Sequence, residues 1–146
     1  MNTLISGCVG YAIQEDYSGN IWAGTTDGLY CFNKNTEDLE RFTIAEGLPN
    51  NVICGLSEDF RHDIWISTYM GISRYDAKKR CFVNYYSGDG LQGNEFTHGA
   101  FYKDKKGRIY FGGVNGITYF SPESIENVSK ETDVWITDFY VFNQPI

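Results

Sequence analysis

The stretch Asp16-Tyr17-Ser18-Gly19-Asn20-Ile21-Trp22 decides the fold, because it returns twice along the 146-residue chain. The second copy, Asp59-Phe60-Arg61-His62-Asp63-Ile64-Trp65, begins 43 residues after the first. The third copy, Asp104-Lys105-Lys106-Gly107-Arg108-Ile109-Tyr110, begins 45 residues after the second. A period of about 40–50 residues is typical of repeat proteins and of propeller blades.

Three further landmarks keep the same register. Gly28-Leu29 corresponds to Gly71-Ile72 and Gly116-Ile117, Phe32 to Tyr75 and Phe120, and Glu46-Gly47-Leu48 to Asp89-Gly90-Leu91. Chance does not keep four landmarks in one register, so the chain contains an internal repeat.

Each copy has the pattern of four short strands separated by turn residues. In the middle copy these are Val52 to Glu58, Ile64 to Thr68, Ile72 to Tyr75 and Cys81 to Tyr86. The predicted fold is therefore all-β, a partial β-propeller of three four-stranded blades. A β-sandwich is the alternative, but it does not require a repeat in this register. No stretch has the apolar spacing of an amphipathic helix, which excludes a helical solenoid.

Three blades are fewer than the usual 4–8 of a closed ring. The chain is therefore a fragment of a longer propeller, or it completes a ring with other copies of itself. Open blade edges favour pairing, so we expect self-association, with a homodimer of six blades as the simplest arrangement.

Composition supports an all-β chain and limits its partners. Aromatic residues make up 16% of the sequence, and there are 16 Gly against 3 Pro.

The net charge of −7 excludes a nucleic-acid binder, because such a protein needs clustered cations to neutralise phosphates. No run approaches the roughly 20 apolar residues of a membrane span, and residues 1–10 do not resemble a signal peptide.

The sequence predicts neither a metal site nor a cofactor. None of the four cysteines belongs to a Cys-x-x-Cys pair, and no His-Glu-x-x-His motif or calcium loop is present. The cysteines are expected to be buried free thiols. They are Cys8, Cys31, Cys54 and Cys81.

Asp16, Asp59 and Asp104 occupy the same position of each repeat. Repetition favours a structural role, in which the carboxylate accepts backbone N–H groups of its turn, over a catalytic one. The glycine after the second strand is expected to adopt a positive φ. The structural positions are Asp16, Trp22, Gly28, Asp59, Trp65, Gly71, Asp104, Tyr110 and Gly116.

Candidate ligand contacts lie in the loops of one face of the propeller, and Tyr69 and Met70 are the better candidates because they depart from Thr26-Asp27 at the same register. In a propeller, the loops between second and third strands share one face with the segments that join the blades. Amides, a carboxylate and aromatic rings in those loops suit sugar binding, although Asn51 and Asn94 could instead close turns. The candidates are Asp27, Tyr69, Met70, Asn94, Glu95, His98 and Asn115.

The motif Glu15-Asp16-x-x-Gly19-x-Ile21-Trp22-x-Gly24-Thr25-x-x-Gly28-Leu29, followed by Gly47-Leu48-Pro49-x-Asn51-Val52, resembles the two-component regulator propeller repeat. The segment from Gly93 to Pro122 is similar to the last blade of that family. The tail from Val134 to Asn143 is similar to the opening strand of its Tyr-rich Ig-like domain.

The resemblance implies the following division of the chain: blades at 1–51, 52–96 and 97–122, a linker at 123–133, and a first Ig-like strand at 134–146. It also implies part of the periplasmic sensor region of a hybrid two-component histidine kinase. Such regions commonly sense oligosaccharides and control polysaccharide-use genes.

Two other functions compete with a non-catalytic sensor. One is a propeller lyase or hydrolase, for which His98 with Glu95 is the single acid–base pair that can be assembled. The other is a protein-interaction scaffold, since fold alone does not decide function. The resemblance favours the sensor, with no catalysis and no direct membrane contact in this part of the protein.

Overall fold

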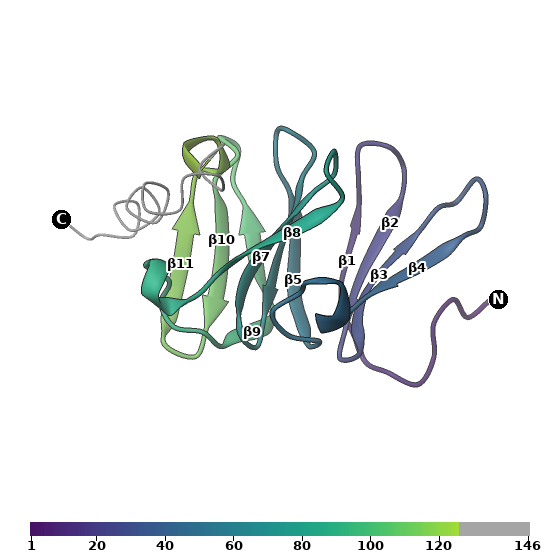
Figure 1. Ribbon diagram of the computed structural model, residues 1–146, viewed down its shortest axis with the longest axis horizontal. Helices are drawn as coiled ribbons and strands as arrows, with labels where there is room; N and C mark the ends of the chain where they lie inside the picture. The colour runs from purple at the N-terminus through teal and green to yellow at the C-terminus, as the bar shows by residue number, and fades with distance from the viewer. Residues whose placement is uncertain (126–146) are drawn as a thin grey trace.

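The protein was analysed as a computed structural model, which describes residues 1–125. Eleven strands form three antiparallel sheets side by side (Figure 1). This confirms the all-β partial propeller. The expected Ig-like strand at 134–146 and most of the linker lie outside the described residues.

The first two sheets each contain four strands in sequence order. The first blade consists of β1 (Gly10–Glu15), β2 (Ile21–Thr25), β3 (Gly28–Phe32) and β4 (Leu39–Phe42). The second consists of β5 (Ile53–Glu58), β6 (Ile64–Thr68), β7 (Gly71–Asp76) and β8 (Cys81–Tyr85). The first strand of each blade is the innermost, since β5 packs against both β1 and β9.

The third blade has three strands over the described residues, where four were expected: β9 (Phe96–Lys103), β10 (Ile109–Gly113) and β11 (Gly116–Phe120). After Phe120 the chain turns into the 3-10 helix η3 (Pro122–Ile125) instead of a fourth strand. Pro122 has no N–H for a ladder hydrogen bond, and Ile125 is buried in the core. These two residues favour the helical turn over a strand at this point.

Two further 3-10 helices lie in the segments that join the blades, η1 (Ile44–Glu46) and η2 (Ser87–Asp89). They lie on the same side of the molecule as the two-residue turns between second and third strands, and we call this side the hairpin face (Figure 1). The opposite side carries the Asp-containing turns 16–20, 59–63 and 104–108, and we call it the turn face.

The hairpins between second and third strands depend on glycine. Gly28, Gly71 and Gly116 have φ values of 108°, 97° and 126°, in the left-handed region that residues with a Cβ rarely adopt. At Gly71 a Cβ would also collide with the carbonyl oxygen of Tyr85 on the neighbouring strand. The glycine is therefore required by both backbone conformation and space.

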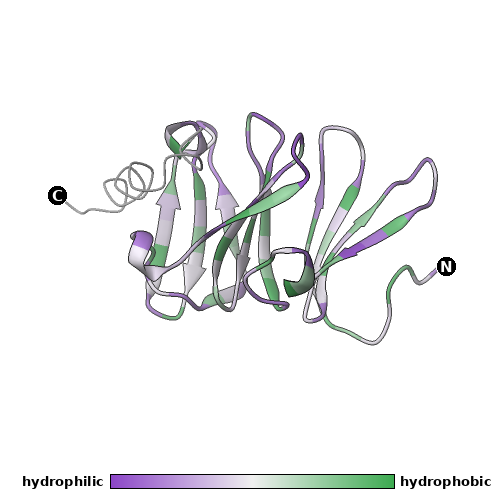
Figure 2. Ribbon diagram, in the orientation of Figure 1, coloured by the Kyte–Doolittle hydropathy of each residue, from purple (hydrophilic) through white to green (hydrophobic). Residues whose placement is uncertain are grey.

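The core lies between the blades, and apolar residues recur along their strands (Figure 2). Trp22 of the first blade packs on Tyr75 of the second, with ring centroids 5.2 Å apart. Trp65 packs in the same way on Phe120 of the third blade at 4.6 Å. The two tryptophans after the repeated Ile therefore hold the first and second blades against the blades that follow them. Within residues 1–125, no helix is long and apolar enough to cross a membrane.

Candidate functional site

The repeated aspartate organises the turn between first and second strands. One carboxylate oxygen of Asp59 accepts the backbone N–H groups of Arg61 and Asp63 at 2.8 and 3.0 Å. The other accepts the indole N–H of Trp65 at 2.9 Å. Both oxygens are thus occupied by groups of the same turn, and Asp59 is 5% exposed.

The other two copies repeat this geometry. Asp16 accepts from Ser18, Asn20 and the Trp22 indole at 2.8–2.9 Å. Asp104 accepts the phenol of Tyr110 at 2.9 Å and the Arg108 side chain at 2.8 Å.

Desolvation opposes ionisation of Asp104, but hydrogen bonds from Arg108 and Tyr110 outweigh it and lower its pKa to about 2. A carboxylate that accepts turn N–H groups and a side-chain donor in every blade is a structural device.

Three of the candidate ligand residues already bond to other residues of the chain: Asp27, Asn94 and Asn115. Asp27 forms a salt bridge with Arg41 at 2.8 Å. The Asn94 side chain accepts the backbone N–H of Ser87 at 2.7 Å. The backbone carbonyl of Asn94 accepts the N–H of Gly71. Asn94 therefore closes the segment that joins the second and third blades.

Two further amide side chains also bond to neighbouring segments of the hairpin face. The Asn115 side chain donates to the carbonyl of Gln92 at 3.0 Å. Asn51 repeats the geometry of Asn94 one blade earlier, since its side chain accepts the N–H of Ile44 at 2.9 Å. These amides hold neighbouring segments of the hairpin face together.

The remaining candidates gather around the inner strands on the hairpin face. The His98 ring stacks on Tyr11 with centroids 4.2 Å apart and an interplanar angle of 12°. Tyr69 lies in the turn between β6 and β7, and Glu95 immediately precedes β9. We call Tyr11, Tyr69, Glu95 and His98 the axial cluster.

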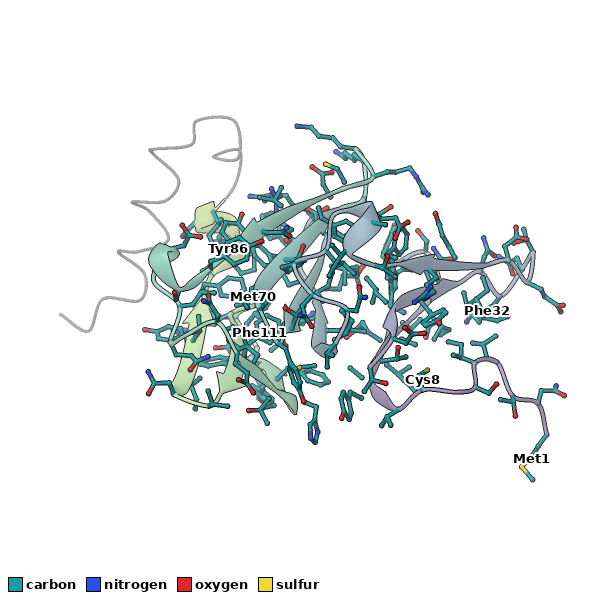
Figure 3. All side chains as sticks on the ribbon, turned by 60° about the horizontal axis from the view of Figure 1, so that its bottom comes forward. Met1, Cys8, Phe32, Met70, Tyr86 and Phe111 are labelled. Carbon is teal, nitrogen blue, oxygen red and sulfur yellow. The ribbon has the colours of Figure 1, made fainter. Side chains whose placement is uncertain are left out.

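Its polar groups remain available to a ligand. Desolvation first, and then Tyr11, Cys54 and Glu95, raise the pKa of the Tyr69 phenol, which therefore stays protonated and can donate a hydrogen bond. Glu95 and His98 are exposed. Met70 follows Tyr69 in the same turn, is 43% exposed and adds an apolar surface (Figure 3).

Tyr11 was not among the residues predicted from the sequence. It lies at a register shift in the pairing of β1 with β2, between Gly10 and Ala12. Such a bulge turns one side chain away from the alternating pattern, so strand periodicity does not reveal it. The repeat itself contained a signal, because Tyr11 occupies the register position of Cys54 and Gly99, and this position varies between blades.

Two clefts lie on the turn face, one between each pair of neighbouring blades. The first, of about 400 Å³, is lined by side chains that include Asp16, Trp22 and Arg80. The second, of about 380 Å³, includes Asp59 and Asp104. Because they recur at the same place in both blade interfaces and are lined by the structural aspartates, we interpret them as gaps between diverging blades.

At the first cleft, one residue departs from the repeat. His62 has a φ of 69° where Gly19 and Gly107 have 89° and 86°. Its ring stacks on Tyr17 of the first blade at 4.0 Å and lies 3.2 Å from a Glu58 oxygen. These contacts compensate for a backbone conformation that is unfavourable for a residue with a Cβ.

Comparison with known proteins identifies similar chains. Residues 3–27 match the family model described as two component regulator propeller. The chain is 30% identical over 120 residues to histidine kinase P4 of Formosa agariphila, a match that covers 82% of this chain and 9% of the kinase.

Solved structures show the same relationship. The extracellular domain of the putative hybrid two component system BT3049 from B. thetaiotaomicron is 38% identical, with a TM-score of 0.75 over 78% of this chain and 16% of that one. Virginiamycin B lyase from Staphylococcus aureus has a TM-score of 0.60 at 17% identity, over 79% of this chain and 39% of the lyase, a likeness of fold alone. The chain thus spans a small part of its relatives.

Proposed function

We propose that this chain, which carries the two-component regulator propeller repeat, is a ligand-binding part of the sensor region of a hybrid two-component histidine kinase and response regulator. The 38% identity to an extracellular domain of such a system supports this proposal, as does the similarity to a histidine kinase. A sensor region of this kind lies in the periplasm, anchored to the inner membrane by segments outside this chain.

The proposed ligand is a neutral oligosaccharide, and the axial cluster is the observation that carries this proposal. Tyr11 and His98 present a stacked aromatic pair, which suits the apolar face of a sugar ring. The Tyr69 phenol can donate a hydrogen bond, and the Glu95 carboxylate can accept bonds from sugar hydroxyls. A chain with a net charge of −7 disfavours polyanionic glycans.

Binding at this cluster would connect the blades. Tyr11 belongs to the first blade, Tyr69 to the second and His98 to the third. A ligand that contacts all three favours one arrangement of the blades over others, and a population shift of this kind is the signal that a receptor can transmit. We infer that the signal controls genes for polysaccharide use.

Catalysis in this chain is disfavoured by the geometry of the proposed acid–base pair. The His98 ring stacks on Tyr11, and among the described residues no hydrogen bond joins it to Glu95. A general acid and base must reach the reacting group together. The chain is therefore proposed to bind without turnover, and the lyase likeness supports no enzymatic function.

Isothermal titration of the chain against maltopentaose, xylopentaose, mannopentaose and laminaripentaose tests this function. One of these glycans is expected to bind, and Tyr11→Ala is expected to weaken its binding at least tenfold. Tyr17→Ala is the matched control, because Tyr17 is 75% exposed on the turn face and should leave affinity unchanged.

Absence of heat with all four glycans would contradict the oligosaccharide proposal, as would unchanged affinity in Tyr11→Ala. Release of shorter sugars, measured by mass spectrometry, would favour the enzymatic alternative.

A further inference from the structure

The hairpin face of the second blade differs from that of the first at three repeat positions. Small polar or charged residues of the first blade are replaced there by larger aromatic or apolar ones. The corresponding residues are Thr26 and Tyr69, Asp27 and Met70, and Thr43 and Tyr86. Because all three positions change in the same direction, the second blade presents a different surface to the solvent.

The three replacing residues are neighbours in space, although one of them is distant in the sequence. Tyr69 and Met70 form the turn between β6 and β7, directly before Gly71. A Cβ on Gly71 would lie 3.1 Å from the ring of Tyr86, so this ring lies against the same hairpin. Figure 3 shows Met70 and Tyr86 on this part of the molecule. We call Met70 and Tyr86 the outer pair.

In the first blade, the same place is closed by polar contacts. Arg41 donates to the side chain of Asp27 at 2.8 Å and to its backbone carbonyl at 3.0 Å. The position of Arg41 is occupied in the second blade by Asn84. The Asn84 side chain bonds to Ser73 and to the carbonyl of Gly47, and therefore serves the sheet and a joining segment instead of the hairpin.

The outer pair is exposed, and the fold does not require its large side chains. Met70 is 43% exposed and Tyr86 is 40% exposed. The start of η2 uses the backbone of Tyr86, whose N–H donates to the Asp89 carboxylate at 2.8 Å. The first blade shows that small polar residues are compatible with both positions. A tyrosine ring is apolar with a polar end, which suits a surface that contacts a ligand.

The outer pair continues the axial cluster towards the edge of the blade. Tyr11 and His98 belong to the inner strands β1 and β9, and Tyr69 belongs to the hairpin in the middle of the second sheet. Tyr86 follows β8, the outermost strand of that sheet. Neighbouring strands lie about 4.8 Å apart, so the path from β5 to β8 is about 14 Å long. Two linked sugar rings do not cover this path, whereas five do.

We propose that the outer pair forms a second subsite for an oligosaccharide that extends from the axial cluster across the second blade, an inference that rests on the proposed function. The Tyr86 ring stacks on a sugar ring, and the adaptable Met70 side chain packs beside it. Ser87 is exposed in η2, and its hydroxyl can donate to and accept from sugar hydroxyls. The site therefore selects glycans by length.

The small size of the outer pair favours a continuation of the same ligand over a separate protein partner. A stable protein interface buries about 800 Å² on each partner, which two side chains do not supply. A sugar ring, in contrast, is matched by one aromatic ring and a few polar groups. Continuity with Tyr69 of the axial cluster supports the same occupant.

Isothermal titration of the full chain tests the subsite by comparing two lengths of each glycan. Each pentasaccharide of the panel is compared with its disaccharide, which is maltose, xylobiose, mannobiose or laminaribiose. The pentasaccharide that binds should do so about tenfold more tightly than its disaccharide, which corresponds to about 1.4 kcal/mol. Tyr86→Ala should remove most of this difference by weakening only the pentasaccharide. A general loss of structure would weaken both lengths.

Three further variants separate stacking from other effects. Tyr86→Phe keeps the ring and should keep the preference for the pentasaccharide. Met70→Asp combined with Tyr86→Thr gives the second blade the residues of the first and should bind both lengths alike. Tyr17→Ala is the control, because Tyr17 is 75% exposed on the turn face. Circular dichroism shows whether each variant keeps its sheet content.

Equal affinity for the two lengths, or an unchanged pentasaccharide affinity in Tyr86→Ala, would overturn the second subsite and leave the axial cluster as the binding site. Equal weakening of both lengths in a folded Tyr86→Ala variant would overturn it as well. Absence of binding by every glycan would overturn both this proposal and the proposed function. Self-association that Tyr86→Ala abolishes in light scattering would assign the outer pair to a contact between copies and contradict the subsite.

Discussion

Replacement of Asp59 by alanine is the sharpest test of how the repeat holds its blades. The Asp59 carboxylate accepts three hydrogen bonds, from the N–H groups of Arg61 and Asp63 and from the indole of Trp65. The Trp65 side chain is 0% exposed and Asp63 is 5% exposed. Their donors therefore cannot turn to water when the carboxylate is removed.

The expected cost is about 3–5 kcal/mol. A buried donor left without its acceptor costs about 1–3 kcal/mol, which applies to the Trp65 indole and the Asp63 N–H. The Arg61 N–H is only partly buried and contributes about 1 kcal/mol at most. Against a total stability of about 5–15 kcal/mol, this is a severe loss, and Tm should fall accordingly.

Urea unfolding followed by tryptophan fluorescence measures the effect. Asp16→Ala should cost less, because the hydrogen bonds that Asp16 accepts from Ser18, Asn20 and Trp22 are exposed or only partly buried. Asp38→Ala is the control, since this exposed residue lies outside the turn and should change stability by less than about 0.5 kcal/mol. A cost below about 1 kcal/mol for Asp59→Ala would refute the hydrogen-bond reasoning.

Three further predictions follow from buried or ionised groups. Arg74→Met should destabilise the chain by about 3–5 kcal/mol in urea unfolding, because it leaves Asp63, its partner at 3.2 Å, as a buried unpaired acid; a neutral effect would contradict this. The pKa of Asp104 is lowered from 3.8 to about 2, so its contribution to stability is present above pH 4 and lost as the pH falls towards 2. Asp104→Asn should therefore flatten the pH dependence of the free energy of unfolding between pH 4 and pH 2. An unchanged pH dependence would contradict the lowered pKa of Asp104. Cys54 is 0% exposed, and burial raises its pKa to about 12, so a thiol reagent at pH 8 should label exposed Cys81 much faster than Cys54, whereas equal rates would contradict the packing.

The blade architecture could be predicted because the repeat constrains it at several levels. The strand predicted at Ile64 to Thr68 has the same bounds as β6, since alternating apolar residues, a preceding turn and a following glycine agree. The repeat did not predict that a 3-10 helix follows β11 in the third blade, where a fourth strand was expected. The absence of that strand from the described residues depends on Pro122, a local signal that the repeat pattern did not include, and on the burial of Ile125, which is a tertiary effect.

Cysteine burial was harder to predict than strand position. All four thiols are free, but only Cys54 is buried, and Cys81 is exposed at the start of β8. The expectation of buried thiols is therefore wrong for Cys81. Cys81 is the first residue of β8, the outermost strand of its sheet. At this edge of the blade its thiol stays exposed, although cysteine is usually buried.

The candidate site could be placed on a face, but not resolved into contacts. The topology brings Tyr69, Glu95 and His98 together, because hairpins and joining segments meet near the inner strands. Asn94 and Asn115 occupy the same face but are held by neighbouring backbone groups. The sequence does not show which amides are already bonded, nor that a bulge turns Tyr11 towards His98.

Hydrogen–deuterium exchange with each pentasaccharide in turn tests the central claim most directly, because it locates the ligand on one face of the blades. We predict that the glycan that binds slows exchange in residues 69–71 and 95–99 of the hairpin face and leaves the turn at 59–63 unchanged. Protection confined to the turns at 59–63 and 104–108 would place the ligand in the clefts of the turn face and contradict the proposed site.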